Sequence, residues 1–239
     1  MAMLTVQGVC TGVGATTVAA NLAVAITAQE QSTLIIECDS KNLVSSYLGK
    51  SESDTKGWAS SFSQSGDWRE GLFESPEQVH FLPFGQAFLE PEVVEKTVAD
   101  IISQSMNRYE HIIVLLDSNC HYDSIVDKSD LNLKVAVPTP SCMTLLFRQL
   151  DNIDPENTRV ILNQYHPEFS ISRDISLVMK DVLKARLLSS NVYFDIAVQE
   201  AQANLSNTLL LASESAVNRE FSQLVAVILS QIEQRSRQR

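Results

Sequence analysis

Short apolar runs rich in Val, Ile and Leu alternate along the chain with longer segments in which apolar residues recur at helical spacing. The short runs predict β-strands and the periodic segments predict α-helices. Strands are predicted at 3–9, 32–39, 79–85, 111–117, 133–140 and 158–164. Helices are predicted at 16–29, 91–106, 175–188 and 219–234, with short helices and loops across the polar stretch 45–78.

The alternation of strands and helices predicts the α/β fold class. Runs such as "HIIVLLD" at 111–117 are apolar throughout, which is typical of strands covered on both faces. We therefore expect a mostly parallel, twisted sheet with helices on both faces. The chain shows no internal repeat and no low-complexity linker, so residues 1–239 are predicted to form a single domain.

Ligands of open parallel sheets bind beyond the carboxyl ends of the strands. Several polar groups are predicted to meet at that edge of the sheet. They are the glycine-rich segment 8–17, Asp39, Asp117 with Ser118, the stretch 139–141, and Asn163. This edge is the predicted ligand site.

The segment "GVCTGVGATT" (8–17) joins a predicted strand to a predicted helix. In the phosphate-binding pattern G-x-x-x-x-G-K-[ST], Gly14 is the second glycine and Thr16 supplies the hydroxyl that binds magnesium. Ala15 stands where the pattern has its lysine. The backbone N–H groups of residues 12–17 and the helix N-terminus would still bind phosphate.

Two other interpretations of this segment remain open. It also fits G-x-x-x-G-x-G, a dinucleotide-binding pattern, with Glu37 or Asp39 placed to bind a ribose hydroxyl. Such an oxidoreductase needs a Tyr with a Lys four residues later, whereas Tyr47 and Lys50 are only three apart. An NAD(P)-dependent oxidoreductase is therefore the weaker alternative. The third interpretation is a tight turn that binds nothing, which the motif alone does not separate from nucleotide binding.

Composition narrows the class of partner. The 239 residues carry a formal net charge of −11, which disfavours binding to nucleic acid and to anionic lipid. The four cysteines lack the spacing of a zinc site or a disulfide framework. With no apolar run approaching about 18 residues and no signal peptide, we expect a cytoplasmic protein with no direct membrane insertion. Trp58, Trp68 and Phe73 are predicted either to face a partner or to belong to the core.

Four segments resemble, in order and spacing, the MinD/ParA group of deviant Walker ATPases, whose loop reads K-G-G-x-G-K-T-T. They are "GVCTGVGATT", "TTVAANLAVAI", "LIIECD" and "YEHIIVLLDS". A further stretch, "GWASSFSQSGDWREGL…VHFLPFGQ" (57–86), is similar to the BcsQ (YhjQ) family encoded in bacterial cellulose synthase operons. The resemblance covers most of the chain. It implies a P-loop NTPase fold of the MinD/ParA type, with ATP and Mg²⁺ as cofactors.

Carried over by position, the resemblance assigns roles to individual residues. It implies phosphate contacts at Gly12, Val13, Gly14, Ala15, Thr16 and Thr17. It implies that Asn163 contacts the adenine base and that Thr16 and Asp39 bind the metal. It also gives Asp39 the catalytic role of positioning water and metal.

The resemblance also marks what has been substituted. Cys10 stands where the group's signature lysine reaches across a dimer, Ala15 where the ordinary lysine would be, and Leu115 at the Walker B aspartate. Asp117 lies two residues later and is predicted to point to the same side as Leu115, where it would replace that acid in part. Each lost group would stabilise charge in phosphoryl transfer. We therefore expect very slow hydrolysis or none.

The family that the chain resembles implies a function in a bacterial cellulose synthesis and secretion system, as a cytosolic accessory component. It implies assembly with a small partner protein of the same operon and with the membrane cellulose synthase, which would recruit it to the inner membrane. A face-to-face homodimer with nucleotide between the loops is the group's mode of association. The expected protein is a nucleotide-binding or degenerate P-loop scaffold, and the alternative is an active MinD/ParA-type ATPase for cellular positioning.

Overall fold

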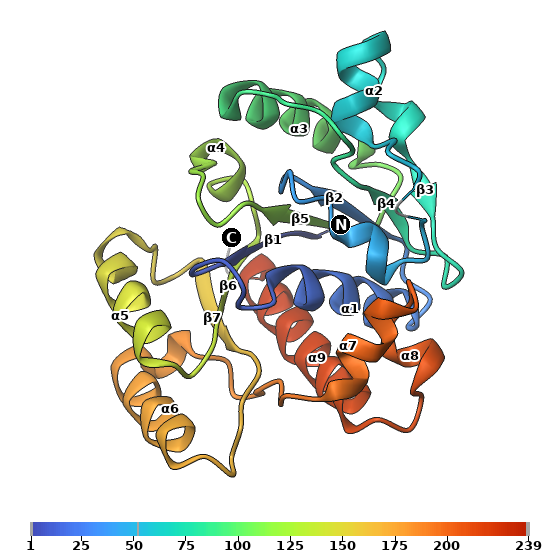
Figure 1. Cartoon of the computed structure of the whole chain (residues 1–239). Helices are drawn as coiled ribbons and strands as arrows, with labels where there is room; N and C mark the ends of the chain where they lie inside the picture. Colours follow the sequence, from blue (N-terminus) through green and yellow to red (C-terminus); the bar gives the residue numbers. More distant parts are fainter. Residues whose placement is uncertain (1, 52, 238–239) are drawn as a thin grey trace.

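The computed structural model describes residues 2–51 and 53–237, and within them the chain forms a seven-stranded sheet flanked by helices (Figure 1). The strand order is β3-β4-β2-β5-β1-β6-β7, and neighbouring strands are parallel except for the antiparallel pair β3 and β4. The strands are β1 (Ala2–Gly8), β2 (Thr33–Glu37), β3 (Phe73–Glu74), β4 (His80–Leu82), β5 (His111–Leu116), β6 (Leu131–Ala136) and β7 (Thr158–Leu162).

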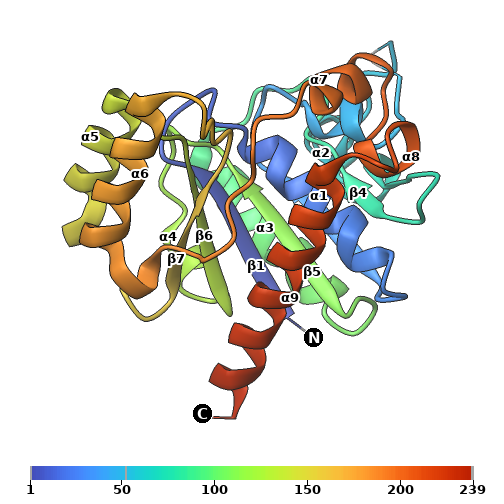
Figure 2. The same cartoon turned by 90° about the horizontal axis from the view of Figure 1, so that it is seen from below.

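Helices cover both faces of this sheet. The α-helices are α1 (Ala15–Thr27), α2 (Trp58–Ser65), α3 (Pro91–Ser105), α4 (Asp123–Val126), α5 (Pro140–Gln149), α6 (Ser170–Leu183), α7 (Ile196–Ala203), α8 (Thr208–Leu211) and α9 (Ala216–Ser236). Short 3-10 helices are η1 (Val44–Tyr47), η2 (Trp68–Gly71), η3 (Leu150–Asn152) and η4 (Lys184–Arg186). Helices α1 and α9 lie on one side of the sheet and α3 on the other, while α5 and α6 flank its β6–β7 end (Figures 1 and 2).

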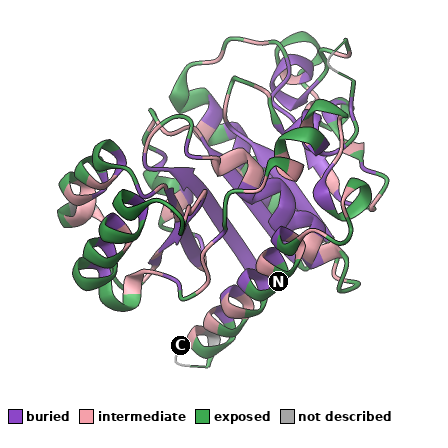
Figure 3. Ribbon diagram, turned by 60° about the horizontal axis from the view of Figure 1, so that its bottom comes forward, coloured by how far each residue is buried: buried purple, intermediate pink, exposed green. Residues whose placement is uncertain are grey.

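The core lies in two layers, one on each side of the sheet, because successive strand residues point to opposite faces. Leu4 and Val6 of β1 belong to the cluster packed against α1 and α9, whereas Met3 belongs to the cluster packed against α3. Figure 3 shows the buried strands between helices whose outer faces are exposed. Trp58 is fully buried in the second cluster and meets the Phe84 ring edge-on at 5.3 Å between centroids, so it belongs to the core.

The predicted fold class is confirmed: the sheet is mostly parallel and helices lie on both of its faces. Helix α5 was not predicted. The strand predicted at 133–140 ends at Ala136, and α5 begins at Pro140. Thr139 caps α5 and Pro140 occupies its first turn, both of which are signals for a helix start. The helix predicted from residue 175 begins at Ser170 and ends at Leu183, because Lys184 takes a positive φ of 50°.

Short helices α4, α7 and α8 were also not predicted, since four to eight residues give too little apolar periodicity to detect. Their starts are local: Asp195 caps α7 and Asn207 caps α8 through hydrogen bonds to backbone N–H groups. Across the described residues, no helix combines the length and the apolar character needed to cross a membrane.

Candidate functional site

The β1–α1 loop (residues 9–14) has a backbone that glycine makes possible. Gly12 and Gly14 both have φ of 82°, in the left-handed region that side chains disfavour. A Cβ on Gly14 would lie 2.4 Å from the Asn163 Nδ2 atom, whereas a Cβ on Gly12 would meet nothing within 4 Å. Gly14 is therefore fixed by both its conformation and its neighbour, and it is the N-cap of α1.

The first turn of α1 presents free donors. Among the described residues, no carbonyl or side chain accepts a hydrogen bond from the backbone N–H groups of Gly14, Ala15, Thr16 or Thr17. Free N–H groups at a helix N-terminus, together with the helix dipole, bind anions. The first turn also carries no acidic side chain that would occupy them.

Two predicted ligand contacts also hold the loop in place. The Asn163 side chain is 3% exposed and donates from Nδ2 to the Val13 carbonyl at 2.9 Å. The Thr17 hydroxyl lies 2.7 Å from the Tyr47 hydroxyl of η1. Both residues line the cavity, so each combines a structural contact with a position at the ligand site.

A cavity of about 300 Å³ opens at the carboxyl edge of the sheet. All the residues assigned from the sequence line it: Gly12, Val13, Gly14, Ala15, Thr16, Thr17, Asp39 and Asn163. The opposite wall comes from the segment 192–195, directly before α7, and from α7 itself. It includes Val192, Tyr193, Phe194, Asp195 and Val198. The sequence did not predict this wall, and the stretch 139–141 expected at the edge does not line the cavity.

The β2–η1 loop (residues 38–43) brings charge to the cavity. The Lys41 ammonium contacts Asp39 Oδ2 at 2.9 Å and Oδ1 at 3.1 Å, and the Lys41 backbone N–H donates to Oδ1 at 3.0 Å. Burial disfavours the ammonium, but the hydrogen bond and negative charge of Asp39 outweigh this and raise the pKa of Lys41. The sequence analysis predicted no role for Lys41, although this lysine lies only two residues after Asp39.

Glu37 holds the base of this loop from inside the core. It is fully buried, and its carboxyl oxygens accept hydrogen bonds from the N–H groups of Leu43 at 2.8 Å, Val44 at 3.1 Å and Phe84 at 3.4 Å. Burial raises the pKa of Glu37 to about 8, and these backbone hydrogen bonds oppose that shift only in part. Glu37 does not line the cavity, so of the two acids that the oxidoreductase alternative offered for a ribose hydroxyl only Asp39 lies at the site.

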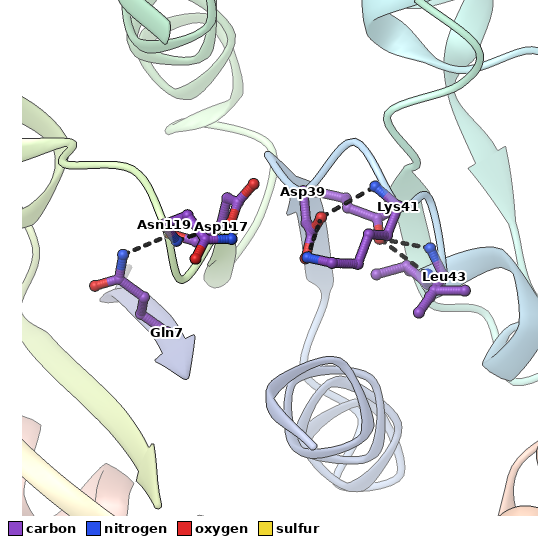
Figure 4. A network of polar contacts seen from close by, with 8 residues as sticks. Gln7, Asp39, Lys41, Leu43, Asp117 and Asn119 are labelled. Carbon is purple, nitrogen blue, oxygen red and sulfur yellow. Dashed lines mark hydrogen bonds and ion pairs between the residues drawn. The ribbon is translucent and has the colours of Figure 1, made fainter. Parts of the chain in front are cut away.

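The position of the Walker B acid is apolar in space as well as in sequence. Leu115 is 1% exposed and packs in the core cluster of α1. Asp117 does not replace it: its Oδ1 accepts from the Asn119 N–H at 2.9 Å, its carbonyl accepts from Gln7, and it does not line the cavity (Figure 4). β5 ends at Leu116, and Leu115 lines the cavity whereas Asp117 does not, so the predicted partial replacement of that acid by Asp117 is not supported by the cavity lining.

The residues present fit a nucleotide better than a metal ion alone. Free N–H groups and the glycine conformation form a cradle for phosphate, with the Thr16 hydroxyl and Asp39 in the same cavity. In the part of the chain that is described, no three His, Cys, Asp or Glu side chains gather in a metal site. Mg²⁺ would therefore depend on phosphate oxygens for part of its coordination, as it usually does.

Comparison with known proteins places the chain in a family. The family model for "Cellulose biosynthesis protein BcsQ" matches residues 1–229. The chain belongs to the BcsQ family. The cellulose biosynthesis protein BcsQ of Escherichia coli (strain K12) is 26% identical over 214 residues, which cover 85% of this chain and 84% of that protein.

Solved structures support the same fold for this BcsQ-family chain. A chain of the MinC:MinD cell division protein complex of Aquifex aeolicus matches with a TM-score of 0.77 at 18% identity, over 96% of both chains. The septum site-determining protein MinD of Pyrococcus horikoshii OT3 matches with a TM-score of 0.70 at 19% identity, over 95% of this chain and 94% of that one. The predicted MinD/ParA-type P-loop fold is thus confirmed.

Proposed function

We propose that this BcsQ-family protein binds ATP at the carboxyl edge of its sheet and acts in cellulose synthesis as a nucleotide-bound scaffold, not as a cycling ATPase. The observation that carries the proposal is the β1–α1 loop. Its glycine backbone and the free N–H groups at the start of α1 are retained, while the charged side chains expected around them are absent. The MinD structure from Pyrococcus horikoshii was solved with Mg-ADP, which supports a nucleotide for this fold.

Catalysis depends on the lost groups more than binding does. A single preorganised donor at developing charge is worth about 10²–10³ in rate. Here Ala15 and Cys10 replace both lysines of the group's loop, and Leu115 replaces the Walker B acid. Phosphate binding by backbone N–H groups requires none of these side chains.

The scaffold would work in the cytosol with other proteins of the cellulose system. We propose that it assembles with a small partner protein of the same operon and with the membrane cellulose synthase, and that these contacts bring it to the inner membrane. A homodimer around the cavity belongs to this proposal, although Cys10 has no charge to contribute across such an interface.

The test is to denature the purified protein and analyse any nucleotide that it releases, together with melting curves in ATP·Mg²⁺. We expect released adenine nucleotide or a clear rise in melting temperature, because a ligand that binds only the folded state stabilises it. Neither effect would overturn the binding proposal. Steady ATP turnover that Asp39→Ala abolishes would instead establish the alternative, an active ATPase, for which Asp39 and Thr16 in one cavity are the supporting observation.

A further inference from the structure

The cavity contains one positive charge. Among the described residues that line it, Lys41 is the only lysine, arginine or histidine, and the acids are Asp39 and Asp195. Asp195 is already engaged, because its carboxylate caps α7 and accepts from the Ser215 hydroxyl. A nucleoside triphosphate entering this cavity would meet backbone N–H groups on one side and the Lys41–Asp39 pair on the other.

The ion pair between Lys41 and Asp39 costs little free energy to break. The Lys41 side chain is 46% exposed, and its ammonium pairs with the single carboxylate of Asp39. An ion pair whose lysine is 46% exposed, although its aspartate is only 14% exposed, contributes modest net stability, since water reaches the ammonium and ordering a lysine side chain is costly. Moving the ammonium from a carboxylate to a phosphate oxygen replaces one charge-assisted contact with another.

The backbone around Lys41 is anchored by hydrogen bonds to residues elsewhere in the fold. Glu37 binds the N–H groups of Leu43 and Val44, and Asn42 Oδ1 accepts from the Gly85 N–H at 2.8 Å. Figure 4 shows the Lys41 side chain folded back onto Asp39, separate from the Gln7, Asp117 and Asn119 group. The loop therefore places a lysine side chain that is 46% exposed on an anchored backbone beside the cradle.

We propose that Lys41 is the phosphate-binding cation of this site, and that its ammonium leaves Asp39 for the phosphate oxygens of a bound nucleoside di- or triphosphate. This inference rests on the proposed function. Lys41 takes over the electrostatic role that Ala15 and Cys10 do not fill, from a neighbouring loop. The Asp39 carboxylate is released in the same exchange, which couples phosphate binding to an acid at the cavity.

The experiment is calorimetric titration of the full chain with ATP, ADP and adenosine, first in EDTA and then with Mg²⁺. Lys41→Met is compared with Lys96→Met, which removes the same charge from an exposed position on α3. We expect Lys41→Met to weaken ATP binding by about tenfold or more, as the loss of a charge-assisted contact predicts, and to leave adenosine binding unchanged. Lys41→Arg should retain most of the ATP affinity, and Lys96→Met should behave as the wild type.

For Asp39→Asn we expect the opposite effect on ATP affinity. Without Mg²⁺, removing the competing carboxylate should tighten ATP binding, and Lys41→Met should cancel that gain. Wild-type protein that binds no nucleotide would overturn both this inference and the proposed function. Wild-type binding that Lys41→Met leaves intact would overturn the Lys41 assignment alone, as would an equal loss of affinity for adenosine.

Discussion

The β1–α1 loop and the β2–η1 loop face one cavity but are held in opposite ways. The first has no charged side chain, and its shape comes from Gly12 and Gly14, whose φ values only glycine adopts easily. The second carries Asp39 and Lys41 and is held by a buried acid, Glu37. One loop supplies geometry and the other supplies charge.

Under the proposed function, this difference separates two properties of the phosphate site, its backbone geometry and its charge. A backbone cradle depends on glycine conformation and on a helix N-terminus, so it persists when nearby side chains change. Charge belongs to individual side chains, so a single substitution removes it, and the proposal is that Lys41 supplies it from the adjacent loop. The predictions below alter one loop at a time.

The largest expected effect comes from Glu37→Ala, which removes the acid that holds the β2–η1 loop. The N–H groups of Leu43, Val44 and Phe84 would lose their acceptor inside the core. We expect the free energy of unfolding to fall by about 2–5 kcal/mol, since a buried donor without a partner and a new cavity both destabilise. Urea denaturation measures this, and Asp39→Ala, at a more exposed position, should cost far less. Equal losses for the two variants would contradict the structural role of Glu37.

The pH dependence of this acid has a definite sign. The folded pKa of about 8 lies above the usual value of 4.5, so the folded state keeps a proton that the unfolded state has lost between these values. The Glu37 contribution to stability is thus complete below about pH 4.5 and is lost as pH rises toward 8. Glu37→Gln, measured in EDTA beside the wild type, should abolish this part of the slope. Parallel stability curves for the two proteins would refute the raised pKa.

The next prediction breaks the geometry of the β1–α1 loop and leaves its charge unchanged. Gly14→Ala and Gly12→Ala each force a side chain into the left-handed region, at about 1–2 kcal/mol of unfolding free energy. Only at Gly14 does the new Cβ also collide with Asn163. Gly14→Ala should therefore be the less stable variant and should lose most ATP binding. Equal behaviour in denaturation and in ATP titration would show that Asn163 does not set the loop.

A further prediction returns charge to the β1–α1 loop. Ala15 lines the cavity at the position where the phosphate-binding pattern has lysine. Ala15→Lys should tighten ATP binding by about tenfold, because hydrogen bonds to charged groups contribute about 1.5–3 kcal/mol. In the Ala15→Lys background, Lys41→Met should then cost less affinity than it does alone. Independent effects of the two changes in calorimetric titration would argue against a shared phosphate ligand.

The sequence predicted the parts of this site that depend on local signals. The apolar runs located the central strands, and the glycine spacing with Thr16 located the phosphate cradle, because both patterns involve residues close together in the chain. Asp39 followed from its place at the end of a buried strand. These inferences needed no knowledge of which distant segments pack together.

The rest depended on packing between distant segments. The wall around Tyr193 reaches the cavity because the Val192 N–H bonds the Leu162 carbonyl of β7 and the Tyr193 N–H bonds Glu220 of α9. No short sequence pattern predicts contacts between residues that lie so far apart in the chain. The Asp117 prediction assumed strand alternation one residue past the end of β5 at Leu116, and Asp117 does not line the cavity.

The smallest expected effect concerns the contact that joins the two regions. Tyr47 lies in η1, directly after the β2–η1 loop, and its hydroxyl meets the Thr17 hydroxyl in the first turn of α1 at 2.7 Å. Tyr47→Phe removes this hydrogen bond and keeps the ring in the core, so the unfolding free energy should fall by only about 0.5–1.5 kcal/mol. If the bond couples the two loops, Tyr47→Phe will also reduce the penalty of Lys41→Met on ATP affinity, measured as a double-mutant cycle. Additive effects in that cycle would mean that the cradle and the cation bind phosphate independently, although they share one cavity.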